Sequence, residues 1–373
     1  MSQQVEQDFQ MSKDENNLKK TPLYKKHLEQ GARMVPFSGW NMPVQYTSII
    51  EEHIHTRTAA GLFDICHMGE FFIKGPTAEN DLNRLVTCHI DDMAVGKCKY
   101  GFILNEKGGI IDDLIVFKTS EDEYMLVVNA GTTERDKAWI ENNICPRTEF
   151  YDGSEETAKI DIQGPLSAEI MGRLAGKEKI DGIKRYYFDH IDIIGTGALV
   201  SRTGYTGELG YELFLPAESA EKVWDELIKF EEVKPVGLGA RDTLRLEMGY
   251  SLYGNDIDEE HTPFEANIGK FVYMEKDFIG KEALLKQQEK GVRSILTGFV
   301  CEGRRSARKN FEVVAGEKKI GKVTSAAFSP CLKKGIGLCY MEKEFIVEGE
   351  EVALTDGRIE IDAFIKHIPA YKH

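Results

Sequence analysis

The chain has 373 residues, of which 42% are hydrophobic and 29% are charged, and this composition is typical of a globular protein with two or three domains. Its formal net charge of −15 disfavours non-specific binding to nucleic acid. No apolar run approaches the roughly 18 residues that a membrane-spanning helix needs, so we expect no membrane insertion.

Residues 1–20 form a polar segment that we expect to be a disordered tail, because few large apolar side chains are available for burial. The segment lacks the apolar stretch of a signal peptide. Its four acidic residues are untypical of a mitochondrial transit peptide. We therefore predict a cytoplasmic protein. The seven cysteines are scattered and form no C-x-x-C pair, which predicts free thiols and no metal site.

Residues 21–285 contain mixed helical and strand patterns. The predicted helices cover 22–30, 47–60, 77–86, 132–142, 165–174, 217–230, 238–247 and 281–288. The predicted strands cover 71–74, 100–104, 109–118, 123–129, 158–163, 198–202 and 213–215. This mixture predicts an α+β fold with two interleaved subdomains rather than the regular alternation of a dinucleotide-binding fold.

The C-terminal part, residues 286–373, has a different pattern of short strands and glycine turns. It predicts a separate small β-barrel domain. The predicted strands cover 294–301, 311–314, 319–325, 335–339, 351–354 and 359–368.

The strand predicted over 109–118 carries adjacent aspartates, Asp112 and Asp113, on opposite and otherwise apolar faces. A buried carboxylate without a partner costs several kcal/mol or changes its pKa. Two interpretations stay open. Both residues could lie near the solvent end of the strand, or one could face a cleft as an acid, a base or a hydrogen-bond acceptor.

Residues 201–212 (SRTGYTGELGYE) contain three glycines, Gly204, Gly207 and Gly210, that would let the backbone approach a ligand. Glu208 and Glu212 would be the acceptors. The alternative is an ordinary glycine-rich loop. The segment is not a phosphate-binding P-loop, because the G-K-[ST] ending is missing.

Residues 237–250 (GLGARDTLRLEMGY) begin like a dinucleotide fingerprint, but Asp242 stands at the third glycine position, so we reject NAD or FAD binding. Four charged residues of this segment lie on one predicted helix, and an exposed helix with salt bridges is the alternative to a ligand site. They are Arg241, Asp242, Arg245 and Glu247. We also reject Cys66 and His67 as a nucleophile pair, because adjacent side chains rarely meet.

Six segments together resemble one family, the T proteins of the glycine cleavage system, which are aminomethyltransferases. They are 37–46 (FSGWNMPVQY), 61–70 (GLFDICHMGE), 105–118 (NEKGGIIDDLIVFK), 127–136 (VVNAGTTERD), 201–212 and 237–250. The resemblance runs from about residue 21 almost to the C-terminus. It implies a cloverleaf of three subdomains around a central folate site, ending in a β-barrel.

The resemblance also implies the reaction and its partners. Lipoylated H protein presents an aminomethyl group, tetrahydrofolate takes the carbon, and ammonia leaves. The products are 5,10-methylenetetrahydrofolate and dihydrolipoyl H protein. The family position of Asp113 implies the catalytic carboxylate beside the folate nitrogens. The folate-binding residues implied in the same way are Tyr100, Asn129, Tyr205, Glu212, Arg241 and Tyr250.

Three positions depart from the family pattern. Cys66 stands where serine is usual, Phe117 where tyrosine is common, and Tyr371–Lys372 where a Tyr-Arg pair is expected. Two other functions are alternatives to the aminomethyltransferase. A folate-dependent demethylase would differ in the substrate loops, and an accessory protein for iron–sulfur clusters would carry a K-G-C-[YF]-x-G-Q-E motif, which is absent here.

Overall fold

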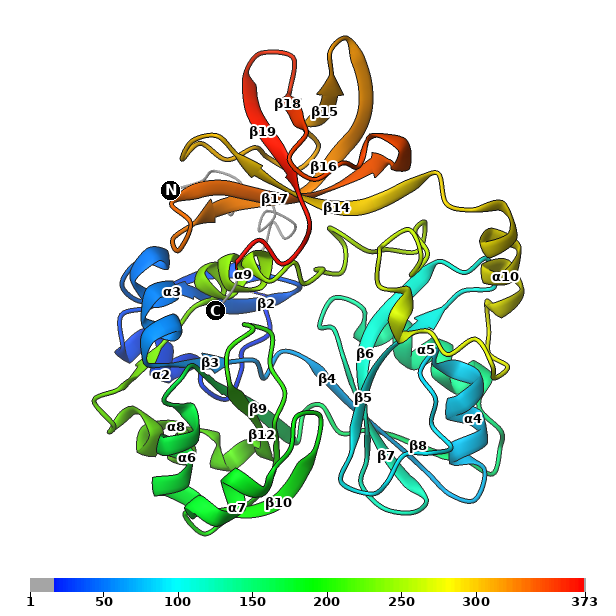
Figure 1. Ribbon diagram of the computed structural model, residues 1–373. Coiled ribbons are helices and arrows are strands. Elements are labelled where there is room, and N and C mark those ends of the chain that lie inside the picture. The colour runs from blue at the N-terminus through cyan, green and yellow to red at the C-terminus, as the bar shows by residue number, and fades with distance from the viewer. Residues whose placement is uncertain (1–16, 372–373) are drawn as a thin grey trace.

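The computed structural model describes residues 17–371 and consists of three parts (Figure 1). Two α+β parts lie side by side, each built on one sheet, and a β-barrel covers one end of both. The predicted α+β fold with a C-terminal barrel is confirmed. Residues 1–16 of the predicted tail, and Lys372, lie outside the described residues. Leu18 is buried and the backbone of Lys19 bonds to Gly39 and Asn41, so packed structure begins before residue 21.

The first part contains a six-stranded sheet, and only its edge strand β13 runs parallel to its neighbour. The strand order is β10 (Phe188–Ile193), β11 (Thr196–Ser201), β12 (Gly210–Pro216), β9 (Thr157–Gln163), β3 (Ala60–Asp64) and β13 (Val233–Pro235). Three helices pack on one face through Ile170, Ile180 and Trp224. They are α6 (Ser167–Ala175), α7 (Lys177–Gly182) and α8 (Ala220–Ile228).

The second part contains a five-stranded sheet that the chain builds between β3 and β9 of the first sheet. The strand order is β5 (Cys98–Leu104), β6 (Ile110–Lys118), β7 (Glu123–Val128), β4 (Gly69–Lys74) and β8 (Glu149–Asp152). Helices α4 (Ala78–Leu85) and α5 (Thr133–Asn143) bury Leu82, Leu85 and Ile140 against it. The first sheet is therefore assembled from chain segments that come before and after the second sheet in the sequence.

Along strand β6, the side chains after residue 111 point alternately to the two faces of the sheet, as predicted, but the side chain of Ile111 itself does not fit this alternation. Leu114 and Val116 pack in the core under the helices, whereas Phe117 packs in a separate cluster on the other side. Ile111 joins the first group, although strict alternation places it in the second. The pairing of β5 with β6 shifts register between Ile103 and Leu104, and this irregularity explains the exception.

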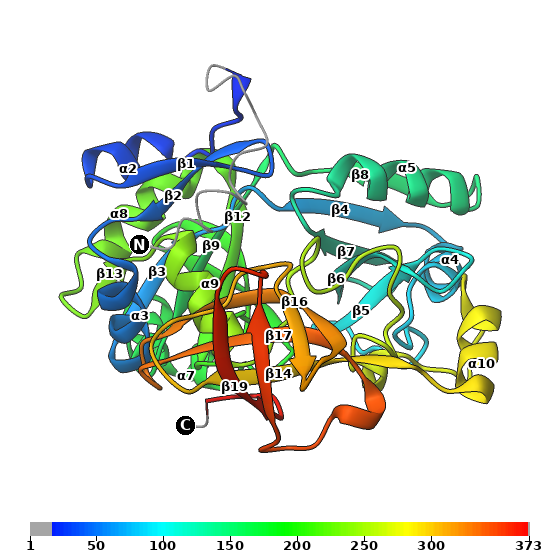
Figure 2. The same cartoon turned by 90° about the horizontal axis from the view of Figure 1, so that it is seen from above.

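The third part is a closed six-stranded barrel, which confirms the barrel prediction. Around the barrel the strands are β14 (Ser294–Cys301), β17 (Lys334–Glu342), β16 (Lys318–Ser329), β15 (Glu312–Ala315), β18 (Glu351–Thr355) and β19 (Glu360–Lys366). Its interior contains Phe299, Val323 and Leu354. Helix α10 (Lys281–Lys290) precedes it (Figure 2).

Helix α9 (Leu238–Glu247) connects the barrel to the first part, and its bounds were predicted correctly. Leu244 packs against Phe63 of β3, whereas Leu246 packs against Leu296 and Leu338 of the barrel. Near the C-terminus, the backbone N–H of Tyr371 donates to the carbonyl oxygen of Glu247 at 3.1 Å. This helix is therefore buried from two sides.

Several short elements were not predicted. They are the hairpin of β1 (Arg33–Phe37) and β2 (Trp40–Gln45), strands β3, β8, β10 and β13, helix α7, and the 3-10 turns η3 (Gly269–Phe271) and η4 (Lys343–Phe345). The 3-10 turn η2 (Ala217–Ser219) forms the start of the helix predicted over 217–230. Four predicted helices, among them α6 and α8, start two or three residues later than expected. Helix α2 (Tyr24–Glu29) begins two residues after Pro22, and α3 (Ile49–Thr58) begins after Ser48, whose hydroxyl caps it by accepting from the N–H of Glu51.

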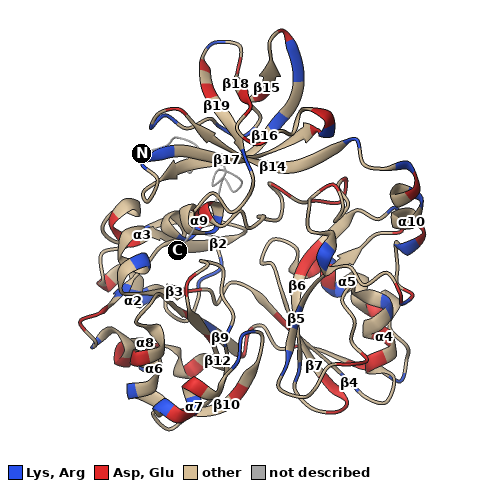
Figure 3. Ribbon diagram, viewed as in Figure 1, with Lys and Arg blue, Asp and Glu red and all other residues tan. Residues whose placement is uncertain are grey.

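Charged residues of both signs are distributed over all three parts (Figure 3). Among the residues that the structure describes, no helix is both long and apolar enough to cross a membrane.

Candidate functional site

All of the predicted site residues line one cavity of about 1710 Å³, where the three parts meet. Asp113, Tyr100 and Asn129 come from the second sheet, and Glu212 comes from the first. Arg241 lies on α9, and Tyr205 and Tyr250 lie on the segments before β12 and after α9. The barrel side is lined by Arg304, Arg305, Arg308, Thr324 and Ser325.

Asp113 lies on one wall and is held by two donors. The Tyr100 hydroxyl donates to its Oδ2 at 2.9 Å, and Asn129 Nδ2 donates to its Oδ1 at 2.9 Å. Burial and the neighbouring Asp112 carboxyl together raise the pKa of Asp113 to about 7, although both donors act in the opposite direction. The carboxyl can therefore gain or lose a proton near neutral pH.

Asp112 points to the opposite side of the strand and is fully buried. Its Oδ2 accepts the backbone N–H of Asn129 and its Oδ1 accepts Asn129 Nδ2, both at 2.9 Å. Neither aspartate lies at a solvent end of the strand, so that interpretation is wrong. Of the two, only Asp113 lines the cavity.

Glu212 lies on the opposite wall, in a network of buried opposite charges. Lys159 Nζ is 2.9 Å from its Oε1, and the Thr203 hydroxyl donates to its Oε2. Beside it on β9, Asp161 Oδ2 is 2.8 Å from Arg241 Nη1. Burial alone would raise the pKa of Glu212, but the Lys159 ammonium and the Thr203 hydroxyl outweigh it and hold the pKa below its usual value. Glu212 is therefore ionised at neutral pH.

Aromatic rings complete the walls. Tyr205 and Tyr250 stack with ring centroids 5.8 Å apart and an interplanar angle of 28°. The Arg241 guanidinium lies over the Tyr205 ring, 5.2 Å from its centroid. The rings of Tyr100 and Phe271 meet in a T-shaped arrangement, with centroids 4.8 Å apart. Flat apolar surfaces with few polar groups suit a planar heterocycle.

Gly204, Gly207 and Gly210 all line the cavity, so their role in letting the backbone approach a ligand stays a prediction. The structure shows a second reason for them. A Cβ at Gly204 or Gly210 would come within 2.3 Å or 2.1 Å of the Gln163 side chain. Gly207 has a φ of +83° and faces Met248. Gln163 bonds to Asp161 and Thr206. The glycines thus also make room for protein side chains behind the cavity wall.

The alternative of α9 as an exposed helix with salt bridges is wrong. Arg245 is only 1% exposed, and besides its pair with Asp242 at 2.8 Å it contacts Asp256 at 2.7 Å. Its Nη2 also donates to the Ser325 hydroxyl of the barrel at 2.9 Å. The charges of this helix therefore join the barrel to the cavity wall.

Cys66 and His67 do not form a nucleophile pair, as predicted. Cys66 is buried, its Sγ donates to the carbonyl oxygen of Lys159 at 3.4 Å, and burial raises the thiol pKa well above its usual value. Burial lowers the pKa of His67 to about 4. Phe117, where the family has tyrosine, lies among Phe188 and Phe214, so it does not face the cavity.

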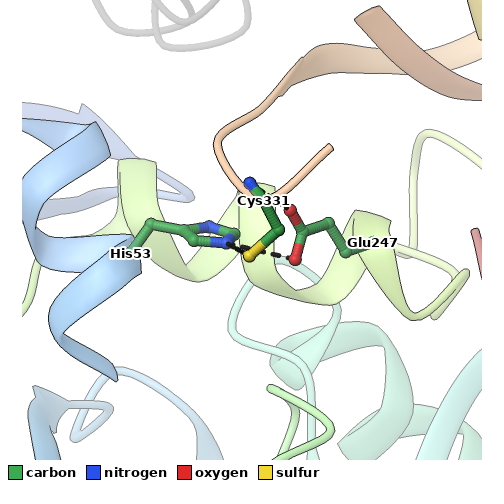
Figure 4. A group of neighbouring side chains, drawn as sticks. All are labelled: His53, Glu247 and Cys331. Atoms are coloured by element: carbon green, nitrogen blue, oxygen red, sulfur yellow. Dashed lines mark hydrogen bonds and ion pairs between the residues drawn. The ribbon is translucent and has the colours of Figure 1, made fainter. Parts of the chain in front are cut away.

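His53, Glu247 and Cys331 place their side-chain ligand atoms within 4.8 Å of one another, so they could hold a metal ion (Figure 4). His53 Nε2 is 3.1 Å from Glu247 Oε2 and 3.4 Å from Cys331 Sγ. The same glutamate oxygen accepts from Arg57 Nη2 at 2.9 Å. Because a guanidinium already balances the carboxylate charge, the group is saturated by protein contacts.

Sequence reasoning missed Lys159 and Asp161, which line or support the Glu212 wall. The sequence of the strand Thr157–Gln163 does indicate them: every second residue is charged or polar, and the residues between them are apolar. This alternation predicts a strand with one polar face. Ile160 and Ile162 pack under the helices, so Lys159, Asp161 and Gln163 necessarily face the other way. The buried Asp136 on α5 was also missed, because nothing in the sequence marks that helix face as buried.

The fold places a large cavity with charged groups and aromatic walls between its three parts. The family model described as GCVT N-terminal domain matches residues 23–276, and the model described as glycine cleavage T-protein C-terminal barrel domain matches residues 295–372. The chain therefore belongs to the glycine cleavage T-protein family.

Individual relatives agree with this assignment. A protein named aminomethyltransferase from Caldanaerobacter subterraneus subsp. tengcongensis is 45% identical over 90% of this chain and 91% of its own. One from Thermotoga petrophila is 44% identical over 95% of this chain and 98% of its own. The crystal structure of the glycine cleavage system aminomethyltransferase T from Bartonella henselae superposes with a TM-score of 0.89, at 32% identity, over 95% of this chain and 98% of the other. The chain is thus an enzyme of the aminomethyltransferase type.

Proposed function

We propose that the cavity binds tetrahydrofolate and that the chain transfers the methylene carbon from the aminomethyl-lipoyl arm of H protein to it. The observation that carries this proposal is the convergence of an ionised glutamate and a carboxyl with a pKa of about 7 on opposite walls of one aromatic-lined cavity. The demethylase and the iron–sulfur accessory protein remain without a specific observation in their favour.

Glu212 is proposed to bind the pterin. The pterin edge presents an N3–H and an exocyclic amine side by side, and one carboxylate can accept both. This role requires a carboxylate that stays ionised, and Lys159 and Thr203 keep Glu212 in that form. Tyr205 and Tyr250 would flank the ring system, and Arg241, beside Tyr205, would contribute a cation toward the anionic folate.

We propose that Asp113 is the general base and acid that accepts and returns protons during the transfer. N5 and N10 of the folate each lose one proton when they bond to the transferred carbon. One of these protons converts the leaving amine to ammonia, and the other converts the lipoyl thiolate to a thiol. A carboxyl with a pKa of about 7 can accept a proton in one step and return it in the next. Tyr100 and Asn129 orient its oxygens, each from 2.9 Å.

The proposed partners are lipoylated H protein and tetrahydrofolate, with no nucleic acid and no membrane, and the proposed location is the cytoplasm. A cavity volume of about 1710 Å³ agrees with a site that receives both a folate and the end of a lipoyl arm. No resident metal is part of the proposal.

The test is reconstitution of the reaction. The protein is mixed with aminomethyl-loaded lipoyl H protein and tetrahydrofolate, and both ammonia and 5,10-methylenetetrahydrofolate are measured. We expect the two products in equal amounts, and no ammonia above background when folate is omitted. Failure to turn over an H protein that a known family member accepts would refute the proposal.

A further inference from the structure

One buried amide side chain lies behind the cavity wall that carries Glu212. Gln163 is the last residue of β9 and is fully buried. Gly204 and Gly210 line the cavity in front of it, and they leave the space that its side chain fills, because a Cβ at either position would come within 2.3 Å or 2.1 Å of that side chain. Gly210 is also its pairing partner on β12. The amide therefore lies against the inner side of backbone that borders the cavity.

The Gln163 amide uses both of its N–H groups and its carbonyl oxygen. Its Nε2 donates to Asp161 Oδ1 at 2.5 Å and to the carbonyl oxygen of Thr203 at 3.1 Å. Its Oε1 accepts from the Thr206 hydroxyl at 2.8 Å. The Thr203 carbonyl can only accept, and the Thr206 hydroxyl already accepts the N–H of Glu208 at 3.2 Å, so it gives its own hydrogen to the amide. The partners thus fix the orientation of the amide.

The two groups that Gln163 holds from behind are themselves the supports of two predicted folate-binding residues. The second oxygen of Asp161, Oδ2, is 2.8 Å from Arg241 Nη1. The hydroxyl of Thr203 donates to Glu212 Oε2. Arg241 and Glu212 lie on different elements, α9 and β12. Gln163 joins them through one residue on each side.

The segment of residues 203–209 depends on side chains for its position, because it forms no strand between β11 and β12. Its far end is held by the Ser167 hydroxyl, which donates to the carbonyl oxygen of Leu209 at 2.9 Å. Its middle is held by the Arg57 guanidinium. Gln163 is the side chain that ties its near end to β9, where the proposed pterin carboxylate is supported.

We propose that Gln163 is a positioning residue for folate binding, which fixes the Glu212 carboxylate and the Arg241 guanidinium in one arrangement. The proposal rests on the proposed folate-binding roles of these two residues. One carboxylate accepts two neighbouring donors only when its oxygens are correctly directed, and groups that are ordered before binding lose less entropy when the ligand arrives. Asp113 lies on the opposite wall, so the effect of Gln163 is on affinity rather than on proton transfer.

Gln163→Glu is the sharpest test, because it keeps the shape of the side chain and makes its bonding depend on pH. A protonated carboxyl still donates to Asp161 and accepts from Thr206, whereas an ionised one donates to neither acceptor and repels the Asp161 charge. We expect the ratio of variant to wild-type Kd for tetrahydrofolate to be smallest at acidic pH. It should rise about tenfold as the pH rises through the pKa of the new carboxyl.

The ratio is taken at each pH because the charged groups around this position titrate in the wild type as well. They are Lys159, Asp161, Glu212 and Arg241. A ratio that is the same at every pH, whether large or small, would overturn the proposal, since a merely structural role of Gln163 gives no dependence on the charge of the new group.

Gln163→Met fills a similar space and donates nothing, so it leaves Asp161 Oδ1 and the Thr203 carbonyl without their donor. We expect folate affinity to weaken about tenfold to hundredfold at every pH. The KM for folate should rise accordingly, and kcat at saturating folate should equal that of the wild type. Wild-type affinity, or a lower kcat with an unchanged KM, would refute the positioning role.

Ser167→Ala is the matched control, because it removes a hydrogen bond from the far end of the same segment and leaves both partners of Gln163 in place. Its folate affinity should equal that of the wild type. A measurement without ligand separates this proposal from the proposed function. The backbone amides of residues 203–206 should exchange hydrogen faster in Gln163→Met than in the wild type, and unchanged exchange would refute the positioning role even if folate binds. Absence of folate binding by the wild type would instead refute the proposed function of the cavity.

Discussion

The two walls of the cavity use the same kind of side chain in opposite ways. On the wall of the first sheet, Glu212 and Asp161 are paired with Lys159 and Arg241 at 2.9 and 2.8 Å. On the wall of the second sheet, Asp113 is surrounded by neutral donors and by a further carboxyl, and within residues 17–371 it forms no ion pair. The pKa of Glu212 consequently lies below its usual value, whereas that of Asp113 is raised to about 7.

This difference shows what determines the role of a buried carboxylate. With a cation beside it, the group keeps its charge and serves as a permanent acceptor for fixed donors. Without one, it exchanges a proton near neutral pH and can serve in catalysis. Asp161 lies between these cases, since burial and the Glu212 charge raise its pKa to about 6 despite Arg241.

The largest effect on activity is expected for Asp113→Asn. The amide cannot accept a proton, so kcat should fall by about 10²–10⁴, the usual share of general acid–base catalysis. The affinity for folate should change little, because the cavity keeps its shape. Turnover and equilibrium folate binding measure the two effects separately. Asp112→Asn is an unsuitable control, because it would place an amide against the donors of Asn129.

Glu212→Ala should weaken the binding of folate, in contrast to Asp113→Asn, which should lower kcat. Loss of an ionised acceptor for two donors is expected to cost about 1.5–3 kcal/mol, which corresponds to about a tenfold to hundredfold weaker affinity for folate. Lys159 is then left buried without its carboxylate, so the free energy of unfolding should also decrease. Glu208→Ala, on the same segment but paired with Arg57, is the matched comparison. Equal folate affinity in Glu212→Ala and wild type would contradict the pterin role.

The contrast between the walls could be foreseen from the sequence only in part. Alternation placed Asp112 and Asp113 on opposite faces, and the family resemblance selected Asp113, which does line the cavity. The partners of these carboxyls could not be foreseen. Lys159 and Asp161 are distant in sequence from Glu212 and Arg241, which they contact, and the pairing of strands and helices decides which charges meet.

The fold was predicted best where the patterns are long. Helix α9 and the strands of the barrel follow regular apolar spacing, whereas β3 and β13 are short and each forms part of a sheet assembled from distant segments. Strand β1 contains Pro36, which removes a donor and weakens the strand signal. The register shift between β5 and β6 leaves no trace in the sequence, and it reversed the side predicted for Ile111.

Lys159→Met tests whether the Lys159 ammonium alone accounts for the opposite pKa shifts of Glu212 and Asp113. Without the ammonium, burial would dominate and raise the pKa of Glu212, as it does for Asp113. A raised pKa means that Glu212 is protonated, and folate affinity lost, as the pH falls through the new value. We expect near-normal affinity at alkaline pH and weaker affinity at acidic pH, measured by titration at a series of pH values. An affinity that is equally reduced at every pH would contradict this explanation.

The smallest effect is expected for Tyr100→Phe, which removes one of the two donors to Asp113 without adding charge. That hydroxyl lowers the pKa of Asp113, so its loss should raise the pKa above about 7. The base form is the ionised one, so the rate increases as the pH rises through this pKa, and the acidic limb should move to higher pH. A bond to a charged group contributes about 1.5 kcal/mol, which predicts a shift of about one pH unit. Because Asp113 keeps its bond to Asn129, activity at alkaline pH should stay within a few-fold of wild type, and a large loss there would mean that Tyr100 takes part in the reaction itself.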